Sequence, residues 1–122
     1  MSTTYRVVAA DDSGLARKHV EKALAGTEFE LVASVANGQL AVEAFAEHRP
    51  DVVLLDLLMP KLPGNDALKE ILALDPAAVV FMVSSLGTEE LVSECMETGA
   101  KGFIQKPFAP DDLLERMRAA LD

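Results

Sequence analysis

Five residues whose types suit phosphate chemistry follow the short apolar runs of the chain. Asp11 and Asp12 come after the first run, Asp56 after the third, Ser84 after the fourth and Lys106 after the fifth. If these runs are strands of an open α/β sheet, ligands bind beyond their carboxyl ends. We therefore expect the five side chains to lie at one edge of the sheet and to form one site.

The acids in this set predict a metal site. If the strands that precede Asp11 and Asp56 are neighbours, three carboxylates crowd together and their pKa values rise unless a cation neutralises them. Oxygen ligands with no His or Cys beside them favour Mg²⁺ or Mn²⁺, and Mg²⁺ often shares its shell with a phosphate. Asp56 would then attack phosphorus in line, while Lys106 and the metal neutralise the equatorial oxygens and Ser84 donates a hydrogen bond.

Two kinds of segment alternate along the chain and must position these residues. Apolar runs typical of strands covered on both faces are residues 6–10, 29–35, 52–55, 79–83 and 102–104. The stretches between them have apolar residues at helical spacing, and Ser13 and Thr88 are placed to cap two of the helices. This alternation predicts a (βα)₅ chain with right-handed crossovers and an open parallel sheet that has helices on both faces.

Composition restricts the classes of protein. The chain has 122 residues, which fits one compact domain, and its net charge of −9 opposes binding to nucleic-acid phosphates. Its single cysteine cannot form an internal disulfide, and its amino terminus lacks the pattern of a signal peptide. No apolar run approaches the roughly 20 residues of a membrane span, so we expect a cytoplasmic protein.

The order of motifs resembles the CheY-like receiver domain of two-component response regulators over essentially the full length. The matching segments are the pair Asp11-Asp12, the stretch 56–60 (Asp-Leu-Leu-Met-Pro) with Gly64, Ser84 after an apolar strand, and the stretch 99–108. The resemblance implies a doubly wound, flavodoxin-like sandwich with strand order 2-1-3-4-5. It also implies that residues 1–122 form one stand-alone receiver domain, monomeric or dimerising on phosphorylation.

The resemblance further implies the role of each acid. Asp56 would accept a phosphoryl group from a phosphohistidine on a histidine kinase or a phosphotransfer protein. Asp12 and Asp56 would bind Mg²⁺ directly, with Mn²⁺ as a substitute, while Asp11 would act mainly through water and the Leu58 carbonyl would complete the ligands. Such a protein is a signalling switch that catalyses only its own phosphorylation and slow dephosphorylation.

The remaining implied residues concern signal output. Lys106 would pair with the phosphoryl group, and the Lys106-Pro107 peptide bond is expected to be cis. Ser84 would move toward the phosphate and Phe103 would turn inward with it. A downstream protein would then bind the face made by the fourth helix, the fifth strand and the fifth helix.

Departures from the family pattern predict slow loss of the signal. Leu58 and Leu86, two positions after Asp56 and Ser84, are both apolar, so neither can orient the water that hydrolyses an acyl phosphate. Pro63 alters a loop without touching a ligand. Phe103 lacks the hydroxyl of the tyrosine that is common in chemotaxis receivers.

Three other interpretations remain open at this point. The chain could be the receiver fragment of a longer regulator. It could be an aspartyl-nucleophile phosphohydrolase, although Asp56-Leu-Leu lacks the second acid of an Asp-x-Asp motif and no cap domain fits in 122 residues. It could also be a binding-only pseudo-receiver, although none of the required acids, the lysine or the hydroxyl is missing.

Two further residues receive structural assignments only. Cys95 is assigned to the core and Lys22 to a solvated helix face.

Overall fold

The computed structural model describes residues 4–85 and 88–121, which form five strands and five helices in strict alternation. In chain order the elements are β1 (Tyr5–Ala10), α1 (Gly14–Leu24), β2 (Phe29–Val35), α2 (Gly38–His48), β3 (Val52–Leu55), α3 (Gly64–Leu74), β4 (Val80–Ser84), α4 (Glu89–Thr98), β5 (Gly102–Gln105) and α5 (Pro110–Leu121).

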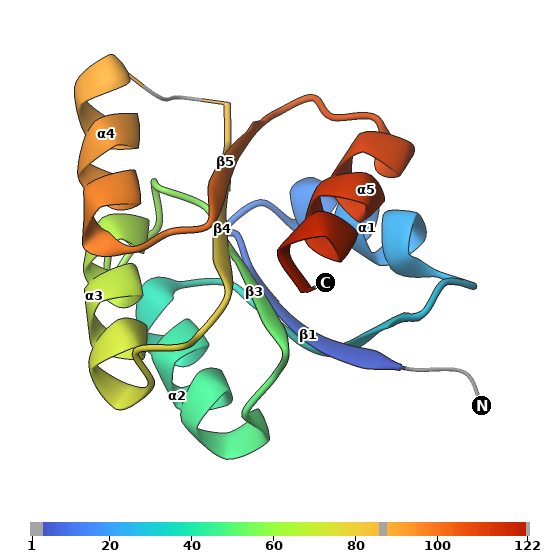
Figure 1. Ribbon diagram of the computed structural model, residues 1–122, viewed down its shortest axis with the longest axis horizontal. Coiled ribbons are helices and arrows are strands. Elements are labelled where there is room, and N and C mark those ends of the chain that lie inside the picture. The colour runs from blue at the N-terminus through green and yellow to red at the C-terminus, as the bar shows by residue number, and fades with distance from the viewer. Residues whose placement is uncertain (1–3, 86–87, 122) are drawn as a thin grey trace.

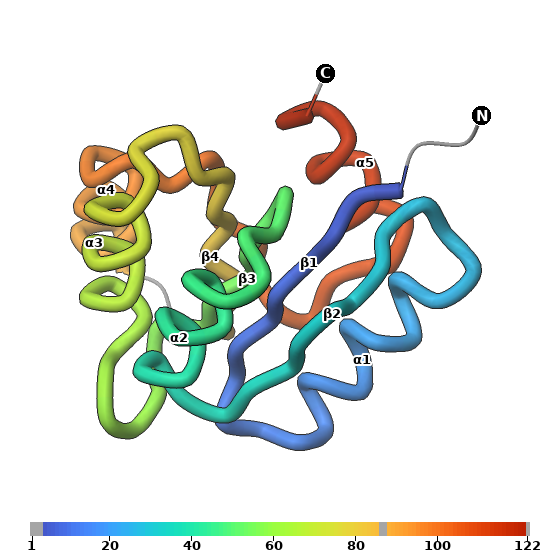
Figure 2. The backbone as a smooth tube through the Cα atoms, turned by 90° about the horizontal axis from the view of Figure 1, so that it is seen from below, coloured from blue at the N-terminus to red at the C-terminus, as the bar shows by residue number. Residues whose placement is uncertain are grey.

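All strand pairs are parallel, and the strands lie in the order β2-β1-β3-β4-β5. Helices α1 and α5 cover one face of the sheet and α2, α3 and α4 cover the other (Figure 1). Figure 2 shows the sheet between these two helical layers. The predicted doubly wound (βα)₅ fold with strand order 2-1-3-4-5 is confirmed. No helix within the described ranges has both the length and the apolarity that crossing a membrane requires.

The central strands are buried because helices cover both of their faces. Val53 and Leu55 point into the core under α2 and α3, whereas Val52 and Leu54 point into the core under α1 and α5. None of these four side chains is more than 2% exposed. Consecutive apolar residues in the sequence therefore supply both cores, as the alternating direction of strand side chains requires.

Side-chain caps fix where the helices begin. The Ser13 hydroxyl accepts a hydrogen bond from the Ala16 amide at the start of α1, and the Thr88 hydroxyl accepts one from the Leu91 amide at the start of α4. Both caps were predicted. These caps satisfy amides that a helix leaves unpaired in its first turn.

Gly64 lets α3 begin directly against the end of β3. A Cβ atom at Gly64 would lie 1.9 Å from the Asp56 carbonyl oxygen, a distance that no real side chain reaches. The Gly64 amide also donates a hydrogen bond of 2.9 Å to the Leu57 carbonyl. The turn that carries Asp56 is thus held by backbone on both sides.

Some boundaries and one helix face differ from expectation. β4 runs one residue further along the chain than predicted, so Ser84 is its last residue rather than the residue after it. The apolar stripe assigned to α4 is correct for Cys95, which is 1% exposed, but wrong for Met96, which is 43% exposed. Far from Ser84, at the amino end of the sheet, Tyr5 stacks on Phe29 with ring centroids 5.5 Å apart.

Candidate functional site

Three carboxylates converge at the carboxyl end of the sheet. Ala10 and Leu55 are partners in the β1–β3 register, so the residues that follow them, Asp11 and Asp56, leave the sheet side by side. One carboxylate oxygen each from Asp11, Asp12 and Asp56 lies within 4.8 Å of the others. Asp11 and Asp56 are buried and Asp12 is exposed, which gives the cluster one open side.

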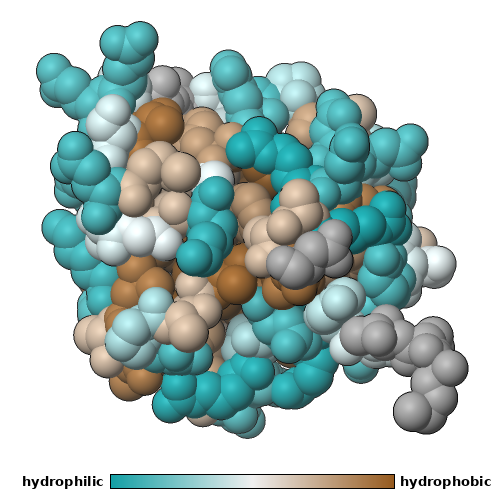
Figure 3. All heavy atoms as spheres, viewed as in Figure 1, coloured by the Kyte–Doolittle hydropathy of each residue, from teal (hydrophilic) through white to brown (hydrophobic). Residues whose placement is uncertain are grey.

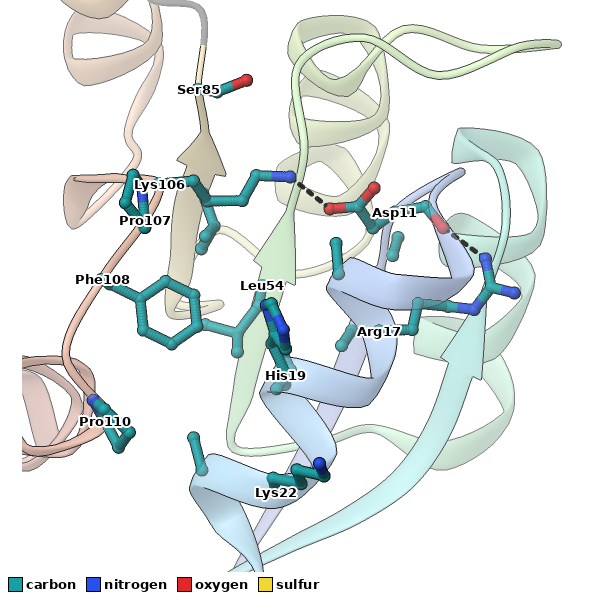
Figure 4. Close-up of a pocket in the computed structure, with 16 residues that line it drawn as sticks. Asp11, Arg17, His19, Lys22, Leu54, Ser85, Lys106, Pro107, Phe108 and Pro110 are labelled. Atoms are coloured by element: carbon teal, nitrogen blue, oxygen red, sulfur yellow. Dashed lines mark hydrogen bonds and ion pairs between the residues drawn. The ribbon is translucent and has the colours of Figure 1, made fainter.

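Asp11 is held by three separate contacts. Its Oδ1 accepts a hydrogen bond of 2.9 Å from the Ser13 amide, and its Oδ2 accepts one of 2.6 Å from Lys106 Nζ. The Arg17 guanidinium donates a hydrogen bond of 2.6 Å to the Asp11 backbone carbonyl (Figure 4). These contacts fix both the side chain and the backbone of the loop between β1 and α1.

Lys106 reaches the cluster from the far side of β4. Its Nζ lies 2.6 Å from Asp11 Oδ2 and 3.6 Å from Asp56 Oδ2. The Lys106-Pro107 peptide bond is cis, as predicted. One ammonium group therefore faces two of the three carboxylates.

The surroundings of Asp56 favour its neutral form. Burial and the negative charge of Asp11 raise the pKa of the Asp56 carboxyl above its ordinary value. A hydrogen bond with the Ser84 hydroxyl, the charge of Lys106 and the Leu57 amide, which donates to Oδ1 at 2.8 Å, oppose this rise. An added cation beside Asp56 would lower this pKa and so favour the carboxylate, which is the form that acts as a nucleophile.

A hollow of about 370 Å³ brings the predicted residues together. Its lining includes all three acids, Ser84, Lys106 and Leu58. Ser84 is 2% exposed, whereas the Leu58 side chain is 56% exposed at the rim. Phe103 lies outside this hollow, next to Met82 in the β4–β5 register and packed against the core under α3. Leu86 lies outside the described residues.

Arg17 is a site residue whose role sequence reasoning missed. The sequence analysis assigned it no role, whereas its side chain turns back from α1 to the Asp11 carbonyl. The available signal was position, because Arg17 follows the Ser13 cap by one helical turn and so starts close to the loop that carries the acids.

Comparisons with known proteins agree with the fold and identify the family. The profile of the response regulator receiver domain matches residues 7–118, and the chain belongs to this family. It is a CheY-like receiver of the kind that serves phosphorelay signalling.

Individual relatives cover nearly the whole chain. The chemotaxis protein CheY of Bacillus subtilis is 39% identical over 118 residues, which are 97% of this chain and 98% of that protein. CheY of Thermotoga maritima is 37% identical over 92% of this chain and 93% of its own length. Among solved structures, the CheX-CheY-BeF3-Mg²⁺ complex from Borrelia burgdorferi matches with a TM-score of 0.93 and 34% identity, covering 98% of this chain and 91% of that one.

Proposed function

We propose that Asp56 accepts a phosphoryl group from a phosphohistidine and that its phosphorylation changes the affinity of this receiver for a protein partner. The observation that carries the proposal is the convergence of a buried carboxylate with a lysine and two further acids in one hollow. The whole chain would act as one receiver domain whose donor is a histidine kinase or a histidine phosphotransfer protein.

The donor set fits a magnesium ion. Asp11, Asp12 and Asp56 supply only carboxylate oxygens, and the nearby Leu58 carbonyl would add a fourth oxygen of the kind that Mg²⁺ binds. Burial and the charge of Asp11 raise the pKa of the Asp56 carboxyl, and a divalent cation beside it would oppose this rise. When bound, the ion would neutralise phosphoryl oxygens during transfer. The Borrelia CheY structure holds Mg²⁺ together with BeF3.

Asp56, Lys106 and Ser84 each have a separate role in phosphoryl transfer. An Asp56 carboxylate oxygen forms a bond to phosphorus as the bond from phosphorus to the donor imidazole nitrogen breaks, and that nitrogen keeps the electron pair. The Lys106 ammonium group, which already faces Asp56, turns toward the incoming phosphoryl oxygens and stabilises their negative charge. The Ser84 hydroxyl donates a hydrogen bond to one of these oxygens and so leaves its present contact with Asp56.

Movement of Ser84 would be transmitted to a binding surface through β4 and β5. Ser84 pairs with Gln105 in the register of these strands, and Phe103 precedes Gln105 by two residues and is half-buried. Figure 3 shows apolar residues gathered in the middle of this face, between the more polar surfaces of α4 and α5. This face would bind the downstream protein, with Phe103 as the residue that turns inward.

Phosphoryl uptake tests the proposal directly. The purified chain is incubated with acetyl phosphate, with and without Mg²⁺, and its intact mass is followed over time. We expect a metal-dependent gain of one phosphoryl group that Asp56→Asn abolishes and that Asp112→Asn, a change to an exposed acid of α5, leaves intact. Uptake by Asp56→Asn at the rate of the unchanged protein would overturn the assignment.

A further inference from the structure

A second cavity, larger than the hollow around Asp56, opens between α1 and the segment that joins β5 to α5. Its volume is about 550 Å³, within the range of pockets that bind small molecules. Leu54 forms part of its floor, and Lys106 crosses one end on the way to Asp11 (Figure 4). The cavity therefore has a floor, two walls and one end closed by the chain itself.

Small side chains border much of this space. Ala9 in β1 belongs to the core on this face of the sheet and lines the floor, and Ala16 and Ala23 line the wall made by α1. On the opposite wall, the Phe108 ring points into the space between the two walls (Figure 4). Three methyl groups and one aromatic ring therefore border an apolar hollow.

The charges at the border of this hollow are positive. Arg17 and Lys22 border it from α1, and neither forms an ion pair with a carboxylate among residues 4–85 and 88–121. The acid in the lining is Asp11, whose charge is met by Lys106 at 2.6 Å. A chain with a net charge of −9 thus places beside this apolar cavity two cations that pair with no carboxylate of the described residues.

We propose that this cavity binds a small molecule with an apolar body and one anionic group, such as an aryl carboxylate. The body would lie between the Phe108 ring and the alanines of α1, where an aromatic ring can stack in an offset arrangement. The anionic group would face Lys22 at the border, because the Arg17 guanidinium is turned toward the Asp11 carbonyl (Figure 4). The proposal is independent of phosphoryl transfer, but Lys106 closes one end, so an occupant would contact the lysine that the proposed phosphoryl group needs.

Nuclear magnetic resonance on the full chain tests this proposal with 1-naphthoate as the probe. The ¹⁵N-labelled protein is titrated with 1-naphthoate and, separately, with the neutral analogue 1-naphthalenemethanol. We expect saturable shifts of the Ala16, Ala23 and Phe108 amides with a Kd of about 1 mM or below for naphthoate. The alcohol should bind several-fold more weakly.

Matched variants separate this cavity from unspecific binding. Ala16→Met would fill the cavity and weaken the binding of both compounds about tenfold. Ala46→Met, on the exposed side of α2, should change neither affinity. Lys22→Gln should weaken the binding of naphthoate by about threefold and leave the binding of the alcohol unchanged. The control is Lys18→Gln, which changes a neighbouring exposed lysine outside the cavity lining and should alter neither affinity. A thermal melt of each variant confirms that it is folded.

Three results would overturn the proposal. The first is the absence of saturable shifts at millimolar naphthoate. The second is an unchanged affinity in folded Ala16→Met. The third is equal binding of the acid and the alcohol with no effect of Lys22→Gln, which would remove the preference for an anion.

Discussion

Helices α3 and α4 lie side by side on the same face of the sheet, yet the core holds them very differently. α3 buries Gly64, Ala67, Leu68 and Ile71, whereas Cys95 is the one buried residue of α4. α3 follows the strand that ends at Asp56, and α4 follows the strand that ends with Ser84. The helix beside the acceptor is therefore anchored to the core by more buried residues than the helix beside the hydroxyl.

The sequence of α4 explains its weak attachment. Four of its ten residues are glutamates, and all four are exposed: Glu89, Glu90, Glu94 and Glu97. Leu91 and Val92 are only half-buried, so little apolar surface offsets the cost of ordering the helix. A displacement of α4 would expose little that is not already in contact with water.

The largest effect is expected at Gly64, where α3 meets the acceptor strand. Gly64→Ala would place a methyl group 1.9 Å from the Asp56 carbonyl oxygen and should lower the free energy of unfolding by about 3 kcal/mol or more. The control is Gly14→Ala at the start of α1, where the nearest atom would be 3.7 Å away. That change should be neutral or stabilise by up to about 1 kcal/mol. Urea denaturation measures both, and equal effects would show that the close approach is relaxed in solution.

Leucine truncation compares the two helices directly. Leu68→Ala in α3 removes a side chain that is 0% exposed and should cost about 2–5 kcal/mol. Leu91→Ala in α4 removes a half-buried side chain and should cost about 1 kcal/mol. Free energies of unfolding from urea denaturation measure both losses. A loss for Leu91→Ala as large as that for Leu68→Ala would contradict the difference that we draw between the helices.

Cys95 reports the opening of α4, because it is the single cysteine and is 1% exposed. Burial also raises the pKa of its thiol, which keeps it unreactive in the closed state. We expect a disulfide reagent to label it through a local opening that costs at least about 2 kcal/mol less than global unfolding. Labelling rates measured over a range of low urea concentrations test this. Rates that follow only global unfolding would mean that α4 is docked as firmly as α3.

Leu58, in the loop before α3, tests whether this side of the molecule also sets the lifetime of the signal. Its exposed apolar side chain cannot hold a water against a phosphoryl group on Asp56. Leu58→Asn supplies an amide that can, and we expect dephosphorylation about tenfold faster, followed by intact mass after removal of the donor. Leu15→Asn, which changes another exposed leucine, is the control. An unchanged decay in Leu58→Asn would show that other groups limit hydrolysis.

The smallest effects are expected for two exposed ion pairs, one on each face. Arg118 donates two hydrogen bonds of 2.7 Å to Glu28, whereas Lys69 in α3 lies 3.6 Å from Glu94 in α4. At pH 7, Glu28→Gln should therefore lower Tm slightly and Glu94→Gln should lower it less. A larger loss for Glu94→Gln would mean that this pair ties α4 to α3.

The stabilisation that the Arg118–Glu28 pair supplies should also depend on pH. The Arg118 hydrogen bonds lower the pKa of Glu28 from its ordinary value of 4.5 to about 2. Its contribution to stability is therefore complete above pH 4.5 and disappears as the pH falls toward 2. The Tm difference between Glu28→Gln and the unchanged chain should vanish over the same interval.

Most of the fold could be predicted because the pattern that encodes it is local. The continuous apolar run Val52–Leu55 has no polar face, so it requires cover on both sides, and the helical stretches on either side of it supply that cover. The gathering of Asp11, Asp12, Asp56, Ser84 and Lys106 followed from the rule that parallel strands end at a common edge.

The remaining features depend on distances between elements, which residue spacing does not encode. Met96 has the helical spacing of a core residue, but the side of α4 that meets the core carries Cys95 and Leu91, and Met96 is 43% exposed. The contact of Arg17 with the Asp11 carbonyl depends on the direction in which its side chain leaves α1. The cavity beside Phe108 exists because α1 and the β5–α5 segment stand apart, and alanines in the sequence do not reveal such a gap.

The stacking of Tyr5 on Phe29 gives the molecule a reporter of its own folding. The chain has one tyrosine and no tryptophan, and this tyrosine lies at the end of the sheet away from Asp56. Its fluorescence will therefore follow denaturation while remaining silent to events among the acids. Titrations with metal, phosphodonor or naphthoate need another signal, and the emission of Tyr5 can monitor the integrity of the same sample.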